Sequence, residues 1–480
     1  MMQLTYRLTG LAVALLLISI SCQNSNQGQS DIERPSVIII LTDDQGYGDL
    51  GCFGADDIAT PHLDKLAHDG LILTDFYAAQ AVCSASRAGI LTGCYPNRIG
   101  VHGAYMPDSP RGLHPAETTI ADMLKSQGYK TGIFGKWHLG DHPDFMPLNQ
   151  GFDEYFGIPY SNDMWPLHTQ QGPVFDFDPL PLYHNDTVID TLTDQSLLTT
   201  HITERSIEFI ARNKDTPFFA YVAHPQPHVP LYVSDKFKGK SQRGIYGDVI
   251  MEIDWSVGQI VAALDEHQLL ENTLIIFTSD NGPWLNYGSH SGSAYPLREG
   301  KGTAWEGGQR EPTIVHYPKQ IDGGRTLHTP MMNIDILPTI AEITAADLPD
   351  KIIDGKSLWN IWNGKTSESP HEAYYYYYKQ NELHGVRYKD WKLYYPHSYR
   401  TLNGRIGNTD GTPVNYDQDT LRSIELYLLS QDVGETNDVA AEYPEIVDTI
   451  SALADKMRLE LGDNLLGING RNVRESGLIE

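Results

Sequence analysis

A chain of 480 residues, 40% of them hydrophobic, is long enough for one large core or for a large domain with a smaller one beside it. The formal net charge is -27 at pH 7 and the sequence pI is about 4.9. A chain this acidic is a poor partner for nucleic acid or for an anionic membrane surface, so neither is expected as a partner.

The N-terminal residues have the pattern of an export signal. The apolar run Leu11–Ile18 is too short to span a bilayer comfortably. The next segment, Ser19–Cys22, is similar to a bacterial lipoprotein cleavage site, although Ser stands where Leu is usual. We therefore expect a periplasmic or cell-surface lipoprotein of a bacterium, anchored through Cys22, with plain secretion as the alternative. The expected segments are a signal peptide over 1–21 and a flexible tether over 22–34.

Short β-forming runs alternate with longer helical patterns through most of the chain. This alternation predicts an α/β fold with a large, mostly parallel sheet flanked by helices. The first strand, Ser36–Leu41, is a continuous apolar run, which is typical of a strand buried on both faces. The next helix is predicted to start at Thr60 as N-cap, with Pro61 in its first turn, and to be closed by Gly70. The further predicted elements are, in chain order, a helix over 117–127, a strand over 130–134, a helix over 194–212, a strand over 217–222, a helix over 248–266 and a strand over 273–279.

The composition changes after about Lys365, which predicts a main domain over 35–365 and a smaller C-terminal α+β subdomain over 366–480. A tyrosine run in the subdomain could form a sugar-stacking surface, but a half-buried edge sheet is the favoured interpretation. The elements predicted in the subdomain are antiparallel strands at Ala373–Tyr378 and Trp391–Tyr395, a possible third strand at Tyr427–Leu429 and a helix from about Pro444 to Leu461.

The chain has four cysteines, too few for a disulfide scaffold. Cys22 and Cys83 fall within motifs, which leaves Cys52 and Cys94. These two could pair in an exported protein, but the sequence does not determine their geometry.

Each polar cluster of the main domain follows a predicted strand. In an open α/β sheet the carboxyl ends of the strands meet at one crevice, so these clusters are expected to lie close together. The clusters are Asp43-Asp44, Lys136-Trp137-His138, His224–His228 and Asp280-Asn281-Gly282.

The side chains of these clusters fall into two chemical groups. Three carboxylates and one amide, from Asp43, Asp44, Asp280 and Asn281, offer only oxygen ligands, which suit a hard cation such as Ca2+ or Mg2+. The second group is cationic, and positive charges around a negatively charged ester would stabilise its transition state. Its members are Arg87, Lys136, His138, His228 and Lys301, the last within the glycine-rich run 300–308.

A further motif, Cys83-Ser84-Ala85-Ser86-Arg87 followed by an apolar, glycine-closed segment up to Gly93, resembles the signature C-x-P/A-x-R of the formylglycine sulfatases. From about Ser36 to its end the chain is similar to a type I sulfatase. The other matching segments are Leu41–Asp49, Thr131–Gly140, Ser279–Pro283, Gly300–Glu311, Glu425–Tyr427 and Asp432–Asn437, and Gln150–Asp153 with Gly157–Asp163 resemble the arylsulfatase A-like branch.

The resemblance implies an alkaline-phosphatase-like fold and a Ca2+-dependent sulfuric ester hydrolase, with 35–365 as its catalytic domain. It implies that a maturation enzyme oxidises Cys83 to formylglycine, whose hydrate is the nucleophile. Ala85 replaces the commoner proline of the signature. Bacterial maturation enzymes of the radical type accept alanine at this position.

The resemblance also implies a role for each polar residue. The implied Ca2+ ligands are Asp43, Asp44, Asp280, Asn281 and the modified Cys83. In the same way Arg87 would polarise the diol, Lys136 and Lys301 would hold sulfate oxygens, His228 (with Lys301) would protonate the leaving alcohol, and His138 would assist the second step.

The substrate pocket is expected to be bordered by loops. Trp165 could stack on a sugar face, and the other four candidates could hydrogen-bond sugar hydroxyls; the set is Asn162, Asp163, Trp165, His290 and Arg298. An exported sulfatase with such loops suggests a sulfated carbohydrate, cleaved in an exo manner at galactose or N-acetylgalactosamine, with the O4-sulfate as the first choice. The alternatives are a phosphoester or phosphonate hydrolase on the same fold and a non-catalytic lipoprotein that binds sulfated glycans.

Overall fold

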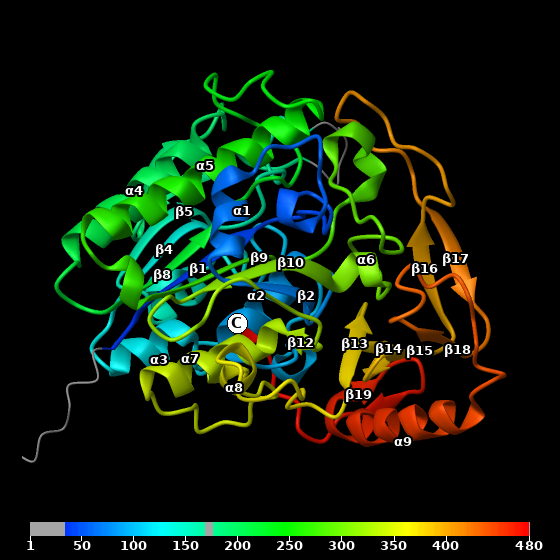
Figure 1. The fold of residues 1–480 in the computed structure, drawn as a ribbon. Coiled ribbons are helices and arrows are strands. Elements are labelled where there is room, and N and C mark those ends of the chain that lie inside the picture. Colours follow the sequence, from blue (N-terminus) through cyan, green and yellow to red (C-terminus); the bar gives the residue numbers. More distant parts are fainter. Residues whose placement is uncertain (1–33, 169–175, 480) are drawn as a thin grey trace, which may run out of the picture. The chain divides into compact units, whose positions relative to one another are not determined.

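The computed structural model describes residues 34–168 and 176–479 (Figure 1). The expected signal peptide, the lipid-anchor residue Cys22 and all but the last residue of the tether lie outside these residues, so export and anchoring stay predictions. Within the described part, no helix is both long and apolar enough to cross a membrane. The expected domain boundary near 365 also stays a prediction.

The core of the molecule is a large mixed sheet, eleven strands in the described residues. In spatial order its strands are β11 (Arg325–Leu327), β2 (Leu71–Tyr77), β10 (Arg310–His316), β9 (Thr273–Ser279), β1 (Ser36–Thr42), β8 (Phe218–Ala223), β4 (Lys130–Lys136), β5 (Glu154–Ile158), β6 (Pro181–His184) and β7 (Thr187–Thr191), with β12 (Met331–Met332) paired to β2. The five central strands, from β9 to β5, are parallel. The strands outside them include antiparallel pairs, at β10 with β9 and β2 and at β5–β6–β7. The predicted mostly parallel α/β sheet is therefore confirmed.

Strand β1 shows why an apolar run specifies the centre of such a sheet. All seven of its residues are buried. Val37, Ile39 and Leu41 belong to the core on one face, and Ile38 and Ile40 belong to the core on the other. Because side chains alternate along a strand, only a continuous apolar run can supply two cores at once.

Helices cover both faces of the sheet (Figure 1). One face packs against α1 (Pro61–His68), α4 (Leu198–Arg212) and α5 (Gly244–Glu266), and the other against α2 (Cys83–Thr92), α3 (Ile120–Ser126), α7 (Ile336–Thr344) and α8 (Trp359–Trp362). The remaining helices are α6 (Glu306–Gln309) and α9 (Pro444–Leu461), together with short 3-10 turns at Gly51–Phe53, Pro96–Ile99, Pro143–Phe145, Pro147–Asn149, Leu270–Asn272, Leu285–His290 and Asn333–Asp335.

Helix α1 starts and ends as predicted, with Thr60 at the N-cap position, Pro61 in the first turn and Gly70 directly after the C-cap residue Asp69. The Thr60 side chain makes no capping hydrogen bond, however; its hydroxyl accepts from the Gly51 amide at 2.9 Å. The first amides of α1 donate to the carboxylate of Asp254 on α5. Helix α3 starts three residues later than predicted because Thr119 forms a capping box at its N-terminus.

The C-terminal residues form a separate antiparallel sheet in the order β13 (Tyr374–Tyr378), β14 (Glu382–Tyr388), β15 (Trp391–Tyr394) and β18 (Glu425–Leu428). The predicted strands β13 and β15 do not pair with each other, because β14, which the sequence analysis missed, lies between them. Helix α9 has the predicted bounds and contributes to the core of this sheet. The other short strands are β3 (Arg111–Gly112), β16 (His397–Thr401), β17 (Asp417–Leu421), β19 (Gly462–Asp463), β20 (Ile468–Asn469) and β21 (Gly477–Leu478).

The tyrosine run of β13 belongs to the protein core. Four of the five tyrosines of β13 are buried, so the run is core and neither a sugar-stacking surface nor a half-buried sheet.

Cys52, Cys83 and Cys94 are all free thiols, so the possible pairing of Cys52 with Cys94 does not occur in this structure.

Candidate active site

The polar clusters of the main sheet meet at the carboxyl ends of its parallel strands. Asp43 and Asp44 follow β1, Asp280 and Asn281 follow β9, and His228 follows β8. Lys136 is the last residue of β4, and His138 comes two residues later. The structure brings these residues together as the topology of a parallel sheet requires, since these strands end at one edge.

Cys83 is the first residue of the buried helix α2 and lies inside this cluster. Its thiol lies 3.5 Å from an Asp43 carboxylate oxygen, and its sulfur lies 3.2 Å from the Lys301 ammonium nitrogen. Burial raises the pKa of the Cys83 thiol to about 12, even though Lys136 and Lys301 favour the thiolate. The unmodified cysteine is therefore protonated at neutral pH and is a poor nucleophile.

Arg87, one turn along α2, joins the two sides of the cluster. Its Nε donates to Asp280 at 2.9 Å, and its Nη1 donates to the Lys136 carbonyl at 2.9 Å. Burial raises the pKa of Asp280 to about 7, with a further contribution from the negative charge of Asp43. Burial acts in the same way on Asp43, but Lys136, His228 and Arg87 outweigh it and hold the pKa of Asp43 well below its usual range.

Two buried lysines neutralise the two adjacent carboxylates. Lys136 forms an ion pair with Asp43, and Lys301 lies 2.7 Å from Asp44. Burial lowers the pKa of Lys301, but Asp44 and its other anionic neighbours raise it well above the usual value. The Lys301 ammonium is therefore charged, and the Lys136 side chain lies in the same cluster through its ion pair with Asp43. They provide fixed positive charge where an anionic group would bind.

The two histidines differ in which ring nitrogen is bound to a backbone carbonyl. His138 keeps its Nε2 2.9 Å from the Tyr105 carbonyl, while its buried Nδ1 has no partner. Burial, together with Lys136 and Arg87, lowers the pKa of His138 well below its usual value, so its free nitrogen is that of a neutral base. His228 lies 2.6 Å through Nδ1 from the Val229 carbonyl, and its Nε2 lies 3.5 Å from Asp44, so Nε2 is the nitrogen that faces the cluster.

The donor set fits a hard metal ion. Ligand atoms of Asp43, Asp44, Cys83 and His228 all lie within 4.8 Å of one another. The Asn281 amide nitrogen donates to Asp44 at 2.7 Å, whereas its carbonyl oxygen is buried and has no partner. A buried oxygen without a donor beside three carboxylates is the chemistry of a Ca2+ or Mg2+ site.

The five predicted substrate residues do not form one surface. The amide nitrogen of the buried Asn162 donates to the His228 carbonyl at 3.3 Å. Burial raises the pKa of the next residue, Asp163, but His228 and other neighbours outweigh it, so the pKa is lowered. Trp165 is completely buried and packs edge-on against Tyr232, so the expected sugar stacking on Trp165 is wrong. The remaining two residues are half-buried: Arg298 stacks 3.5 Å over the Trp305 ring, which is a packing role, and His290 ends the 3-10 turn Leu285–His290.

The structure places two further residues at the site, Glu311 and Trp284, that were not singled out from the sequence. Both oxygens of the buried Glu311 carboxyl lack a partner, and burial together with Asp280 and Asp44 raises its pKa well above the usual value. Trp284 lies between His228 and Lys301, with its ring centre 5.4 Å from the His228 ring and 4.7 Å from the Lys301 ammonium. Its position three residues after Asn281 was the signal that could have singled it out.

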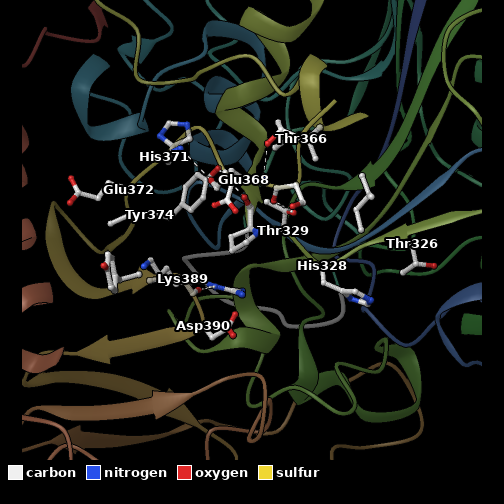
Figure 2. Close-up of a pocket in the computed structure, with 18 of the residues that line it drawn as sticks. Thr326, His328, Thr329, Thr366, Glu368, His371, Glu372, Tyr374, Lys389 and Asp390 are labelled. Atoms are coloured by element: carbon white, nitrogen blue, oxygen red, sulfur yellow. Dashed lines mark hydrogen bonds between the residues drawn. The ribbon is translucent and has the colours of Figure 1, made fainter. Parts of the chain in front are cut away.

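A large cavity elsewhere in the molecule is not this site. It has a volume of about 980 Å3 and lies between the end of β11 and the C-terminal sheet (Figure 2). His371, on its wall, is bound to the buried Asp335 at 2.6 Å, and Tyr374 donates to the same carboxylate. None of the catalytic candidates lines it. The large cavity and the buried cluster around Cys83 are therefore separate features of the molecule.

Comparison with known proteins agrees with this geometry. The sulfatase family profile matches residues 35–346, and the profile of the C-terminal region of aryl-sulfatase matches residues 369–475. Arylsulfatase A of Homo sapiens is 37% identical over 450 residues, covering 87% of each chain. N-acetylgalactosamine-6-sulfatase of Canis lupus familiaris is 34% identical over 446 residues, covering 87% of this chain and 84% of its own.

Solved structures show the same fold. The PsFucS1 sulfatase from Pseudoalteromonas sp. has a TM-score of 0.77 at 27% identity and covers 88% of this chain and 90% of its own. The protein Ps i-CgsB, solved in complex with k-i-k-neocarrahexaose, has a TM-score of 0.74 at 29% identity and covers 88% of this chain and 93% of its own. The chain thus has the alkaline-phosphatase-like sulfatase fold and belongs to the sulfatase family, as a sulfuric ester hydrolase.

Proposed function

We propose that this sulfatase removes sulfate from a sulfated carbohydrate by means of formylglycine at position 83 and one Ca2+ ion. The observation that carries the mechanism is the position of Cys83. It is buried at the start of α2, within 3.5 Å of Asp43 and Lys301, and its thiol is protonated. A side chain so placed but unreactive as a thiol needs conversion to act as a nucleophile, so a formylglycine-generating maturation enzyme is the proposed partner.

The surrounding side chains match such a reaction. Hydrated formylglycine would supply one hydroxyl for attack on sulfur and a second for expulsion of the sulfate, and Ca2+, held by Asp43, Asp44, Asp280 and Asn281, would supply charge beside the sulfate oxygens. Lys136 and Lys301 hold sulfate oxygens with their buried ammonium groups. Arg87 keeps Asp280 in place and orients residue 83 through the α2 backbone. These fixed charges need no rearrangement when negative charge moves toward the leaving oxygen.

The histidines divide the proton transfers between them. His228 faces the cluster with Nε2, so it is the group that gives a proton to the leaving alcohol. His138 is neutral with a free Nδ1, which suits acceptance of the proton from the second hydroxyl in the next step. An acid and a base with separate environments can act in turn at one pH.

A carbohydrate substrate is supported by the names of relatives. The matched enzymes include an N-acetylgalactosamine-6-sulfatase, and one matched structure was solved in complex with k-i-k-neocarrahexaose. We propose exo-acting cleavage at galactose or N-acetylgalactosamine, with O4-sulfate as the first position to test and O6-sulfate as the second. The N-terminal pattern supports export and a lipid anchor at Cys22, which would place the enzyme in the periplasm or at the cell surface, where it meets glycans.

The test is sulfate release by matured protein with Ca2+ from galactose and N-acetylgalactosamine sulfated at O2, O3, O4 or O6. Mass spectrometry of the peptide with residue 83 verifies the aldehyde first, and Cys83→Ala and Cys52→Ser serve as the inactive variant and the matched cysteine control. We expect release from one positional isomer, absent in Cys83→Ala and retained in Cys52→Ser. Release from phosphate or phosphonate esters alone, or from none of the sugars by aldehyde-bearing protein, would contradict the proposal.

A further inference from the structure

Trp284 presents a flat aromatic face beside the reacting groups. Its ring centre lies within 6 Å of both the His228 ring and the Lys301 ammonium. Unlike Trp165, the side chain is only half-buried, and the edge of Tyr287 supports it from one side with ring centres 5.0 Å apart. An alcohol protonated by His228 therefore leaves from a point next to this indole, and the C–H face of a sugar ring packs well on such a surface.

Arg400, on strand β16, brings a positive charge to the same place. Its guanidinium carbon lies 5.9 Å from the Trp284 ring centre and 4.6 Å from the ring centre of Tyr416. Its Nε donates to the Lys301 carbonyl at 2.9 Å, and Nη2 bonds to the same oxygen. The third nitrogen, Nη1, bonds to no acceptor within residues 34–168 and 176–479.

The Glu299 carboxyl interacts electrostatically with Arg400, but it hydrogen-bonds to Thr401 and forms no ion pair with the guanidinium. The chain contains 62 acidic residues and only 35 Lys and Arg, yet in its described portion no carboxylate forms an ion pair with Arg400. Arg405, five residues along, pairs with Asp417 at 3.0 Å, so carboxylates are available in this region. A half-buried guanidinium with an unused face, next to a catalytic lysine, is a recognition site for an anion.

Backbone contacts hold these two side chains in a fixed relation. The loop after Trp284 is bound to the loop between β16 and β17, with the Ser289 amide donating to the Asn408 carbonyl at 3.0 Å and the Val414 amide donating to the Asn286 carbonyl at 3.0 Å. The guanidinium also occupies the space above Gly302, where an added Cβ would come within 2.5 Å of it. The surface is therefore formed before a substrate arrives.

We propose that Trp284 and Arg400 form a subsite for a sugar that carries a second anionic group, a sulfate or a carboxylate, besides the sulfate ester that is cleaved. The sugar ring packs on Trp284, and the second anion pairs with Nη1 of Arg400. This inference rests on the proposed carbohydrate sulfatase function and specifies its substrate as a glycan with more than one negative charge per one or two sugars.

The test compares sugars as competitive inhibitors of 4-nitrophenyl sulfate hydrolysis by the matured protein. The probes are N-acetylgalactosamine 4-sulfate, its 6-sulfate, its 4,6-disulfate and the 4-sulfate joined to a glucuronate, which separates a second sulfate from a neighbouring carboxylate. We expect one doubly charged probe to inhibit at about a tenfold lower concentration than the monosulfates, as a charge-assisted hydrogen bond provides. In Arg400→Ala this ratio falls below about twofold, and Arg400→Lys gives an intermediate ratio.

The controls separate recognition from a structural role. Arg422→Ala removes an exposed arginine, and its inhibition ratio stays as in the wild type. Trp284→Phe and Trp284→Ala weaken the inhibition by all the sugars to a similar extent. Trp391→Phe, at a half-buried tryptophan of β15, leaves the inhibition unchanged. A wild-type ratio near one, or a ratio unchanged in Arg400→Ala, would overturn the inference while leaving the sulfatase activity intact. Sulfate release from none of the sulfated sugars by aldehyde-bearing protein would instead overturn the proposed function and this inference with it.

Discussion

The molecule contains two buried networks of charged side chains, and only one of them has the properties of an active site. The first is the catalytic cluster around Cys83. The second, which we call the junction network, connects the main sheet to the C-terminal sheet and consists of Asp75, Tyr77, Glu306, Arg310, Arg387, Lys392 and Glu435. Both combine lysine, arginine and carboxylates out of contact with solvent, so burial and charge alone do not distinguish them.

The junction network is closed. Lys392 lies 2.6 Å from Glu306, Arg387 lies 2.7 Å from Asp75, and Tyr77 donates to Glu306 at 2.7 Å. No buried side-chain nitrogen or oxygen of its seven members lacks a hydrogen-bond partner. Such a network specifies how two sheets pack, and it leaves nothing for a ligand to bind.

The catalytic cluster is open. The Asn281 carbonyl, the His138 Nδ1 and both side-chain polar atoms of Gln45 are buried without partners. The Cys83 thiol is held by a lysine and a carboxylate but is protonated. Unsatisfied polar atoms cost stability, so their presence beside these charged groups is a stronger indication of function than buried charge is.

The largest expected effect comes from a lysine of the open cluster. Lys301→Met removes a charge that holds the sulfate, and kcat should fall about 100- to 1000-fold, as for the loss of one oxyanion donor. Steady-state kinetics of sulfate release measure this, beside Lys389→Met, an exposed lysine on a turn, as the matched control. A kcat within threefold of the wild type would remove Lys301 from the mechanism.

The matched lysine of the closed network should change stability instead. Lys392→Met removes the cation shared by Glu306 and Glu435 and leaves Glu435 buried without an ion-pair partner, which costs about 3–5 kcal/mol of unfolding free energy. Urea unfolding followed by circular dichroism measures the loss, and adding Glu306→Gln to Lys392→Met should restore part of it. If Lys392→Met unfolded at the wild-type urea concentration, the two networks would not differ as we describe.

Metal removal should affect only the open cluster. A Ca2+ ion at 100 times its Kd stabilises the folded state by about 2.7 kcal/mol, so EGTA should lower the unfolding midpoint of the wild type and abolish sulfate release. Asn281→Ala removes one proposed ligand and should show a smaller EGTA effect, whereas Lys392→Met should show the full one. Midpoints that are identical with Ca2+ and with EGTA would argue against the site.

An effect outside the comparison of the two networks, confined to the pH dependence of stability, is expected from another buried carboxylate. Burial raises the pKa of Asp254 to about 7, while it accepts from the Leu63 amide at 2.8 Å. Because the folded state holds this proton up to about pH 7 and the unfolded state loses it near pH 4, the stabilising contribution is present below pH 4 and decreases as the pH rises to 7. Asp254→Asn lacks this decrease, so its stability relative to the wild type should rise by up to about 1.4 kcal/mol per pH unit in that window. Chemical unfolding at pH 4.5, 5.5 and 6.5 measures the trend, and a constant difference would contradict it.

How much could be predicted from the sequence depended on whether the signal was local. The apolar run of β1, the polar residues after the central strands and the bounds of α9 all have local patterns, and the structure contains them as predicted. Strand β14 was missed because its residues, Glu382–Tyr388, show little alternation and become a strand only between β13 and β15. Thr60 occupies the predicted N-cap position of α1, but the first amides of the helix donate to Asp254, which is distant in the sequence.

The candidate site divides in the same way. The candidate metal ligands and Lys136 could be placed together from the sequence, because parallel strands bring their carboxyl ends together whatever the loops do. Cys83 and Arg87 were named from the motif that resembles the sulfatase signature. The substrate side could not: Trp165 and Trp284 both stand in loops after polar motifs, and only tertiary packing buries the first and half-exposes the second.

By itself the sequence determined the α/β class, the reactive residues and the family resemblance, because apolar periodicity and short motifs act over a few residues. Only the tertiary structure decided which buried charges stay unpaired, and it brought Arg400 beside Trp284 from 116 positions away in the chain. Pairing and exposure depend on contacts between segments that are distant in the chain, and no local pattern carries that information.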